Sequence, residues 1–122
     1  NETLAHEVRG FGIDVNSIAP GALATKMMDQ AIAAGPEAVG AGFHGRMVEL
    51  REEGGTPLAL GAALATYLAS SESDGITGRL ISAVWDPWAS LHLHAKELED
   101  SDIYTLRRVV PLDRGLDWDQ KV

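Results

Sequence analysis

The sequence predicts an α/β fold in which two parallel strands are joined through helices. Three observations support this prediction: short apolar runs at about 13–18 and about 79–84, and a strongly helical stretch between them at 57–70. Parallel strands need a crossover of a dozen or more residues, usually helical, and such crossovers are right-handed. The order of strand, helices and strand therefore favours a parallel sheet that helices cover on both faces.

The composition is that of an ordinary globular domain. Hydrophobic residues make up 45% of the 122 residues, and no apolar run approaches the roughly 20 residues that a membrane-spanning helix needs. A formal net charge of -8 argues against a nucleic-acid partner, because such binding depends on basic side chains that neutralise phosphates. No export signal is visible, so we expect a cytoplasmic protein with neither a membrane nor a nucleic acid as partner.

The first two predicted elements are a short helix and a short strand. Residues 2–8 have helical spacing of apolar side chains, and glycines just beyond them can stop a helix. The run at 13–18 contains isoleucine and valine and is bounded by Gly12 and Pro20. This pattern predicts a strand that is at least half buried.

The middle of the chain predicts helices interrupted by glycine. Between residues 26 and 56, glycines alternate with large apolar side chains, and one helix is expected at about 37–52. Thr56 is a suitable N-cap and Pro57 fits a first helical position, so a second helix should run to Ser70. Along it, Leu58, Ala62, Ala65 and Leu68 or Ala69 recur at the spacing of one helix face.

The pattern becomes less regular after the second strand. A helix is expected at 88–98, and a short strand or turn near 103–110. We therefore divide the chain into residues 1–84, the α/β part, and residues 85–122, an extension that packs on the same domain or on a partner subunit. Trp85 and Trp88 fit either the core or a subunit contact.

Two ordered motifs resemble one family, the short-chain dehydrogenases and reductases, which are doubly wound nicotinamide-dependent oxidoreductases. The first lies at the end of the first strand and matches Asn-x-Ile-x-Pro-Gly-x-Ile-x-Thr, with leucine in place of the second isoleucine. The second, "YLASSESDGITGRLISA", resembles the family's last helix, an Ile-Thr-Gly turn and its seventh strand. The residues of the first motif are Asn16, Ile18, Pro20, Gly21, Leu23 and Thr25.

The resemblance implies the C-terminal part of a Rossmann-like doubly wound parallel sheet, with its cofactor at the carboxyl end of the first strand. Pro20 and Gly21 would turn the chain beneath the nicotinamide ring. The backbone of Leu23 would bond the carboxamide, and the Thr25 hydroxyl would add a further contact. Ligands of open α/β sheets bind at this edge, and glycine permits close approach of the backbone.

The segment after this turn resembles the family's substrate lid. Met27, Met28 and Phe43 lie within it, and flexible thioethers suit a pocket for an apolar small molecule. Packing within a core explains the same side chains equally well.

The family's catalytic groups do not match any part of this sequence. A glycine-rich loop for the pyrophosphate and the Tyr-x-x-x-Lys pair are missing, since Tyr67 is followed four residues later by Ser71, and Tyr104 by Arg108. We therefore expect no catalytic residue here, and a chain that is the C-terminal fragment of an alcohol or carbonyl oxidoreductase. NAD or NADP would serve the full-length parent, with none bound to this chain alone.

The chain is alternatively a free-standing, non-catalytic interaction module that folds by self-association, because two strands alone leave sheet edges uncovered. Under either hypothesis we expect a partner, which is a second copy in a homo-oligomer or the missing N-terminal half. His92, His94 and Glu97 suggest a metal site, but residues two apart on a helix diverge, so a solvated face is favoured and no metal is expected.

Overall fold

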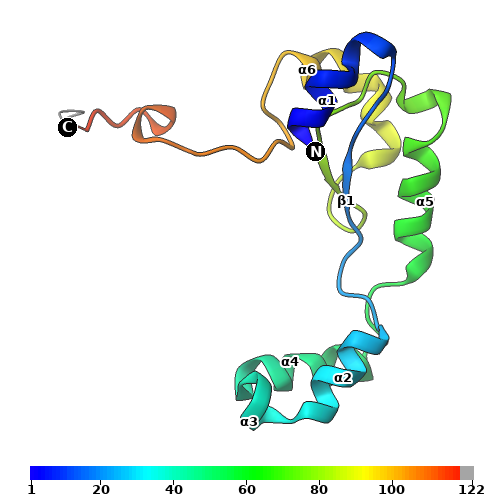
Figure 1. Ribbon diagram of the computed structural model, residues 1–122, viewed down its shortest axis with the longest axis vertical. Coiled ribbons are helices and arrows are strands. Elements are labelled where there is room, and N and C mark those ends of the chain that lie inside the picture. The colour runs from blue at the N-terminus through cyan, green and yellow to red at the C-terminus, as the bar shows by residue number, and fades with distance from the viewer. Residues whose placement is uncertain (119–122) are drawn as a thin grey trace.

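The computed structural model describes residues 1–118, which form three parts (Figure 1). The body consists of residues 1–21 and 56–104 and contains the sheet. The lid lobe, residues 26–52, is a group of helices set apart from the sheet, and the arm, residues 105–118, extends away from the body. No helix within these described residues is long and apolar enough to cross a membrane.

The sheet has two parallel strands, β1 (Ser17–Ala19) and β2 (Leu80–Ser82). Ile18 pairs with Ile81 at the centre of the ladder. The parallel pairing through a helical crossover was predicted from the sequence. A two-stranded parallel sheet in a helix-rich chain is compatible with part of a Rossmann-like fold.

Both strands are shorter than the predicted 13–18 and 79–84. Before β1, the Val15 amide donates to the Thr77 hydroxyl at 2.8 Å instead of to a strand neighbour. After β1, Pro20 has no N–H to donate, which ends the ladder. Side-chain bonding and proline therefore limit the regular pairing to three residues on each strand.

The helices of the body are short. The predicted helix at 2–8 is present as α1 (Glu2–Val8). The predicted helix at 88–98 is divided into a 3-10 helix, η3 (Trp88–His94), and α6 (Ala95–Glu99). The His92 amide donates to the Tyr67 hydroxyl at 3.0 Å, so it is not free for an α-helical bond to residue 88. Two further 3-10 turns are η1 (Arg9–Phe11) and η2 (Ser71–Ser73).

Helix α5 (Leu58–Leu68) differs from its prediction in two ways. Its N-cap is Pro57, not Thr56, and the Thr56 amide donates to the Ala22 carbonyl in another part of the chain. Its buried residues are Leu64 and Tyr67, whereas Leu58, Ala62 and Ala65 of the predicted face are exposed.

The hydrophobic core lies among α5, β2 and the segment from η3 to α6. Leu64 and Ile81 are fully buried. Tyr67 and Trp88 contact each other with ring centroids 5.8 Å apart, and the Trp88 indole N–H donates to the Ala83 carbonyl. Trp88 therefore packs against the core, whereas Trp85 is 82% exposed.

The lid lobe contains α2 (Lys26–Ala34), α3 (Pro36–Val39) and α4 (Ala41–Glu52). The predicted continuous helix at 37–52 is interrupted at Gly40, whose φ of 87° is incompatible with a right-handed helix. The lobe is held together by an ion pair between Arg51 Nε and Asp29 Oδ1 at 3.2 Å.

The end of the chain is largely irregular. Residues 103–104 form a turn, and the arm has no regular element before the 3-10 helix η4 (Pro111–Arg114). The turn alternative predicted near 103–110 is thus found at its beginning.

Candidate functional site

The turn after β1 is built around a glycine. Gly21 has a φ of 91°, and a Cβ at this position would lie 2.5 Å from Thr56 Oγ1 and 2.8 Å from Val84 Cγ2. Val84 follows β2 in the chain. The turn therefore lies at the carboxyl ends of both strands, the edge at which open α/β sheets bind their ligands.

The loop before α5 holds the following segment in place. The Thr56 amide donates to the Ala22 carbonyl at 2.8 Å. Gly55 also has a positive φ, 65°, and a Cβ there would approach the Ala22 oxygen to 2.8 Å. Glycine at both 21 and 55 thus allows two stretches of backbone to pass closely.

Thr25 leads from this segment into the lid lobe. It is the N-cap residue of α2, but its side chain makes no capping hydrogen bond. Its carbonyl accepts the Asp29 amide at 3.1 Å, so the backbone is fixed as the helix starts. The hydroxyl is not used to cap the helix, and Thr25 is among the residues that line the cavity described next.

One cavity of about 210 Å³ brings most of the predicted site residues together. Leu23 and Thr25, predicted to contact the cofactor, line it together with the three predicted lid residues, Met27, Met28 and Phe43. Pro20 and Gly21 lie just before this segment and are not among the lining residues. The remaining lining residues are Ala22, Ala31 and Met47.

The cavity is apolar and open to solvent. Met28 is buried, whereas Met27 is 77% and Phe43 is 51% exposed. Sequence reasoning missed Ala31 and Met47 as lining residues. Ala31 lies four positions after Met27, and Met47 lies four positions after Phe43. This spacing places each of them on the same helix face as the lid residue that precedes it.

The two sequence motifs bond directly to each other at the opposite end of β1. The Asn16 side chain donates to the Ile76 carbonyl at 2.6 Å and accepts from the Arg79 amide at 3.0 Å. Gly78 donates to the Val15 carbonyl at 2.8 Å. The Asn of the first motif and the Ile-Thr-Gly turn of the second therefore fix the register of the sheet that presents the site.

Within residues 1–118, the groups with shifted pKa values lie outside this cavity. Burial raises the pKa of Tyr67, although the hydrogen bond from the His92 amide lowers it. Burial and the neighbouring Asp86 raise the pKa of Tyr104. Neither tyrosine has the lowered pKa that suits a proton donor near neutral pH.

His92, His94 and Glu97 are all exposed on the segment from η3 to α6, which agrees with the solvated face favoured from the sequence. His94 Nδ1 and Glu97 Oε2 are 2.5 Å apart and both side chains are exposed. No group of three metal-binding side chains occurs in the described part of the chain.

Comparisons with known proteins give one result. Searches of curated proteins and of solved structures each found no significant match. A family model described as enoyl-(acyl carrier protein) reductase matches residues 2–83, which include both motifs, the lid lobe and the sheet. The chain therefore belongs to this reductase family of the short-chain dehydrogenases and reductases.

Proposed function

We propose that this chain supplies the nicotinamide-side turn and the substrate lid of an NAD(P)-dependent oxidoreductase that acts on an alcohol or carbonyl group of a small molecule. The observation that carries the proposal is the shared cavity, because Leu23 and Thr25 line it together with Met27, Met28 and Phe43. The family match supports the reaction class.

The residues present fit the nicotinamide end of such a cofactor. Thr25 lines an open cavity and its side chain does not cap α2, and Gly21 brings backbone close to the sheet edge. When bound, the cofactor donates or accepts the hydride. In this proposal the Leu23 backbone and Thr25 hydroxyl orient the carboxamide, while the lid side chains exclude water from an apolar substrate.

We further propose that the chain is the C-terminal part of such an enzyme and is not catalytic by itself. Hydride transfer needs a proton donor beside the substrate oxygen. Tyr67 is buried with its hydroxyl bonded to the His92 amide, and Tyr104 lies near Asp86, which raises its pKa. Neither tyrosine lines the cavity, and in this proposal a preceding segment provides the proton donor and the pyrophosphate site.

The reading frame upstream of Asn1 tests this proposal. We expect it to encode a glycine-rich loop and a Tyr-x-x-x-Lys pair. In the longer polypeptide, Thr25→Ala should raise the KM for the cofactor roughly three- to tenfold, the value of one hydrogen bond. Met27→Ala should raise mainly the KM for the substrate, and Glu49→Ala, exposed on α4, should change neither. A stop codon immediately upstream, or unchanged KM values in both variants, would contradict it.

A second candidate, a non-catalytic module that self-associates, is favoured by the exposed apolar surface of the body. Leu58 at 70% and Phe11 at 79% are far more exposed than the core residues, and the outer edge of β1 pairs with no other described strand. Light scattering tests this candidate, because a well-folded monomer at micromolar concentration would exclude a module that folds by self-association.

A further inference from the structure

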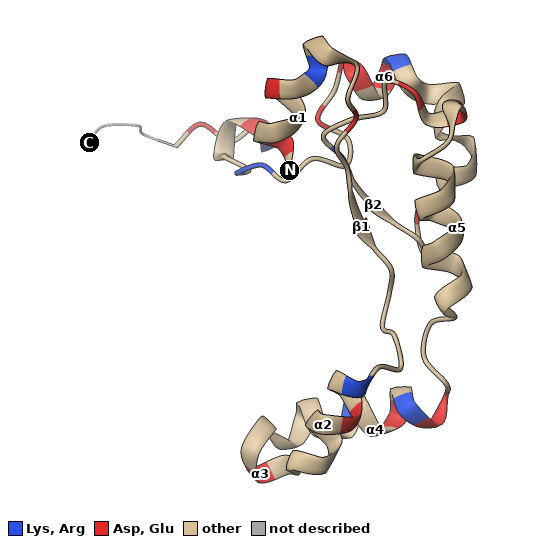
Figure 2. Ribbon diagram, turned by 45° about the vertical axis from the view of Figure 1, so that its right-hand side comes forward, with Lys and Arg blue, Asp and Glu red and all other residues tan. Residues whose placement is uncertain are grey.

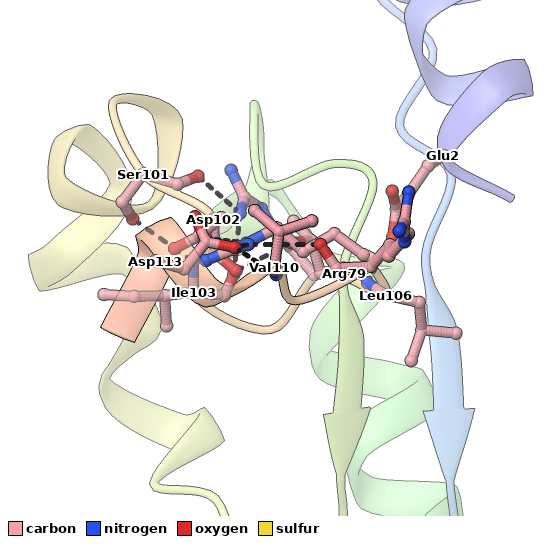
Figure 3. Close-up of polar contacts among 11 residues, drawn as sticks. Glu2, Arg79, Ser101, Asp102, Ile103, Leu106, Val110 and Asp113 are labelled. Carbon is pink, nitrogen blue, oxygen red and sulfur yellow. Dashed lines mark hydrogen bonds and ion pairs between the residues drawn. The ribbon is translucent and has the colours of Figure 1, made fainter. Parts of the chain in front are cut away.

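The root of the arm is fixed by a buried arginine. Arg79 is 5% exposed, and its guanidinium donates to three backbone carbonyls in the segment before the arm. The pKa of Arg79 is lowered by burial, and no described carboxylate forms an ion pair with it. The acceptors are the carbonyls of Ser101 at 3.0 Å, Ile103 at 2.6 Å and Leu98 (Figure 3).

The direction in which the arm leaves the body is also fixed. Tyr104 has a φ of 60°, a conformation that non-glycine residues rarely adopt, and its carbonyl accepts the Leu80 amide at 2.7 Å. The Leu106 amide donates to Glu2 Oε1 at 2.5 Å. The arm is therefore held at its origin rather than frayed.

A second arginine folds the arm locally. Arg107 pairs with Asp102 in the body and with Asp113 in the arm, the latter at 2.7 Å. Asp113 also accepts the Val110 amide at 2.7 Å, which closes the turn that begins η4 (Figure 3). These bonds give the arm a defined shape before it meets any partner, which lowers the entropy cost of binding.

The arm nevertheless exposes large apolar side chains. Clusters of exposed apolar residues usually mark interaction surfaces. Leu112 in η4 is 69% exposed and lies two residues before Arg114. The other exposed members are Leu106, Val109, Leu116 and Trp118.

The charges of the arm and of the rest of the chain are complementary. The arm contains more arginine than aspartate, whereas the whole chain has a net charge of -8. Acidic side chains are frequent on the body, notably in and after α6 (Figure 2). An arm with basic and apolar groups therefore complements the body of a second copy.

The body offers an apolar pocket of about 180 Å³ beside α6. An engineered apolar cavity of roughly 150 Å³ holds benzene, so this pocket is large enough for an aliphatic side chain. Glu97 is among its lining residues, and the Glu97 side chain is 70% exposed. The remaining lining residues are Pro87, Leu91, His94, Leu98, Ile103 and Tyr104.

We propose that the arm of one copy docks on the body of a second copy, with Leu112 in the pocket beside α6 and Arg114 paired with Glu97. Reciprocal docking of two arms buries both leucines and closes a two-fold dimer. This contact does not depend on the proposed catalytic function, because no residue of the lid cavity takes part in it.

Disulfide cross-linking tests this contact directly, because these 122 residues contain no cysteine. A chain carrying Leu112→Cys is mixed with a separate chain carrying Ile103→Cys, and a disulfide between them reports docking across copies. Leu112→Cys mixed with Glu49→Cys, on the distant lid lobe, is the matched control. We expect a heterodimer in the first mixture and only a trace in the second. Equal yields, or no product in either, would overturn the proposal.

Exchanging the charges of Arg114 and Glu97 tests their pairing, and the rescue it predicts cannot come from misfolding of a variant. Arg114→Glu and Glu97→Arg should each weaken the dimer, and the double variant should restore it. Leu112→Asp should raise the dissociation constant of the dimer at least about tenfold, because the burial of one leucine is lost. Light scattering should give the mass of two 13.0 kDa chains for the unaltered protein. A monomer at micromolar concentration, or no rescue by the double variant, would exclude this contact.

Discussion

Thr56 occupies the space in which a side chain at position 21 would lie: a Cβ built on Gly21 is 2.5 Å from Thr56 Oγ1. The contact joins the start of α5 to the turn after β1. It therefore fixes the position of the proposed nicotinamide-side turn relative to α5.

Gly21→Ala should destabilise the chain through both strain and a clash. The positive φ alone costs about 1–3 kcal/mol, and displacing Thr56 and Val84 should add about 1–3 kcal/mol to the loss. Gly35→Ala is the matched control, because Gly35 has a φ of 78° and no atom within 4 Å of its Cβ position. Urea unfolding should show a clearly larger loss at position 21. Equal losses would mean that the contact with Thr56 is not restrictive.

Asn16→Ala should weaken the junction between the two sequence motifs. It leaves the Ile76 carbonyl and the Arg79 amide without their side-chain partner, at a cost of about 1–3 kcal/mol in the free energy of unfolding. Asp14→Ala removes a single exposed bond to the Gly75 amide and should cost less, about 0.5–1 kcal/mol. The prediction fails if the two variants unfold at the same urea concentration.

The turn around η4 should lose stability in acid. The bond from the Val110 amide and the pairing with Arg107 hold the pKa of Asp113 below its ordinary value. A carboxylate with a lowered folded-state pKa stabilises above its unfolded pKa of about 4, and this contribution is lost as the pH falls through the folded-state pKa. Hydrogen exchange of the Val110 amide should accelerate over that range, relative to its intrinsic pH dependence. Asp113→Asn should remove the transition.

The body should lose stability in strong alkali through Tyr67. Burial raises its pKa, so the neutral phenol is favoured by folding. This contribution is complete below the unfolded pKa of about 10 and is lost as the pH rises through the higher folded-state value. Ultraviolet titration should show a delayed phenolate signal that Tyr67→Phe removes. Tyr67→Phe should also cost about 1 kcal/mol through the lost bond from His92.

Local sequence signals predicted the order of elements, and long-range contacts decided their boundaries. The parallel strands followed from two apolar runs and a helical crossover. The start of α5 did not, since Pro57 rather than Thr56 takes the cap position, while the Thr56 amide bonds to the Ala22 carbonyl. The division of the predicted helix at 88–98 likewise depends on Tyr67, which lies twenty-five residues before His92.

The sequence named residues for the candidate site but did not predict its shape. The motif around Pro20 and Gly21 indicated the sheet edge, and the methionines indicated a lid. That Leu23 and Phe43 line one cavity depends on the packing of α2 against α4, which periodicity alone does not specify. The course of the arm could not be predicted either. It depends on hydrogen bonds from Arg79 to backbone carbonyls, and because every residue has a carbonyl, the sequence does not indicate which ones will accept.

The last prediction concerns the isolated chain of 122 residues. We expect no binding of NAD(H) or NADP(H) at micromolar concentration, and no turnover. Leu23 and Thr25 offer only a few hydrogen bonds, each worth about 0.5–1.5 kcal/mol, whereas association costs at least ~4 kcal/mol. The pyrophosphate, which prefers the N-terminus of a helix after a glycine-rich loop, has no such loop in this sequence. Calorimetric titration with each cofactor, and absorbance of the reduced form with carbonyl substrates, measure both expectations. Micromolar binding or measurable reduction would place catalytic groups among the residues that we assign to one wall of the site.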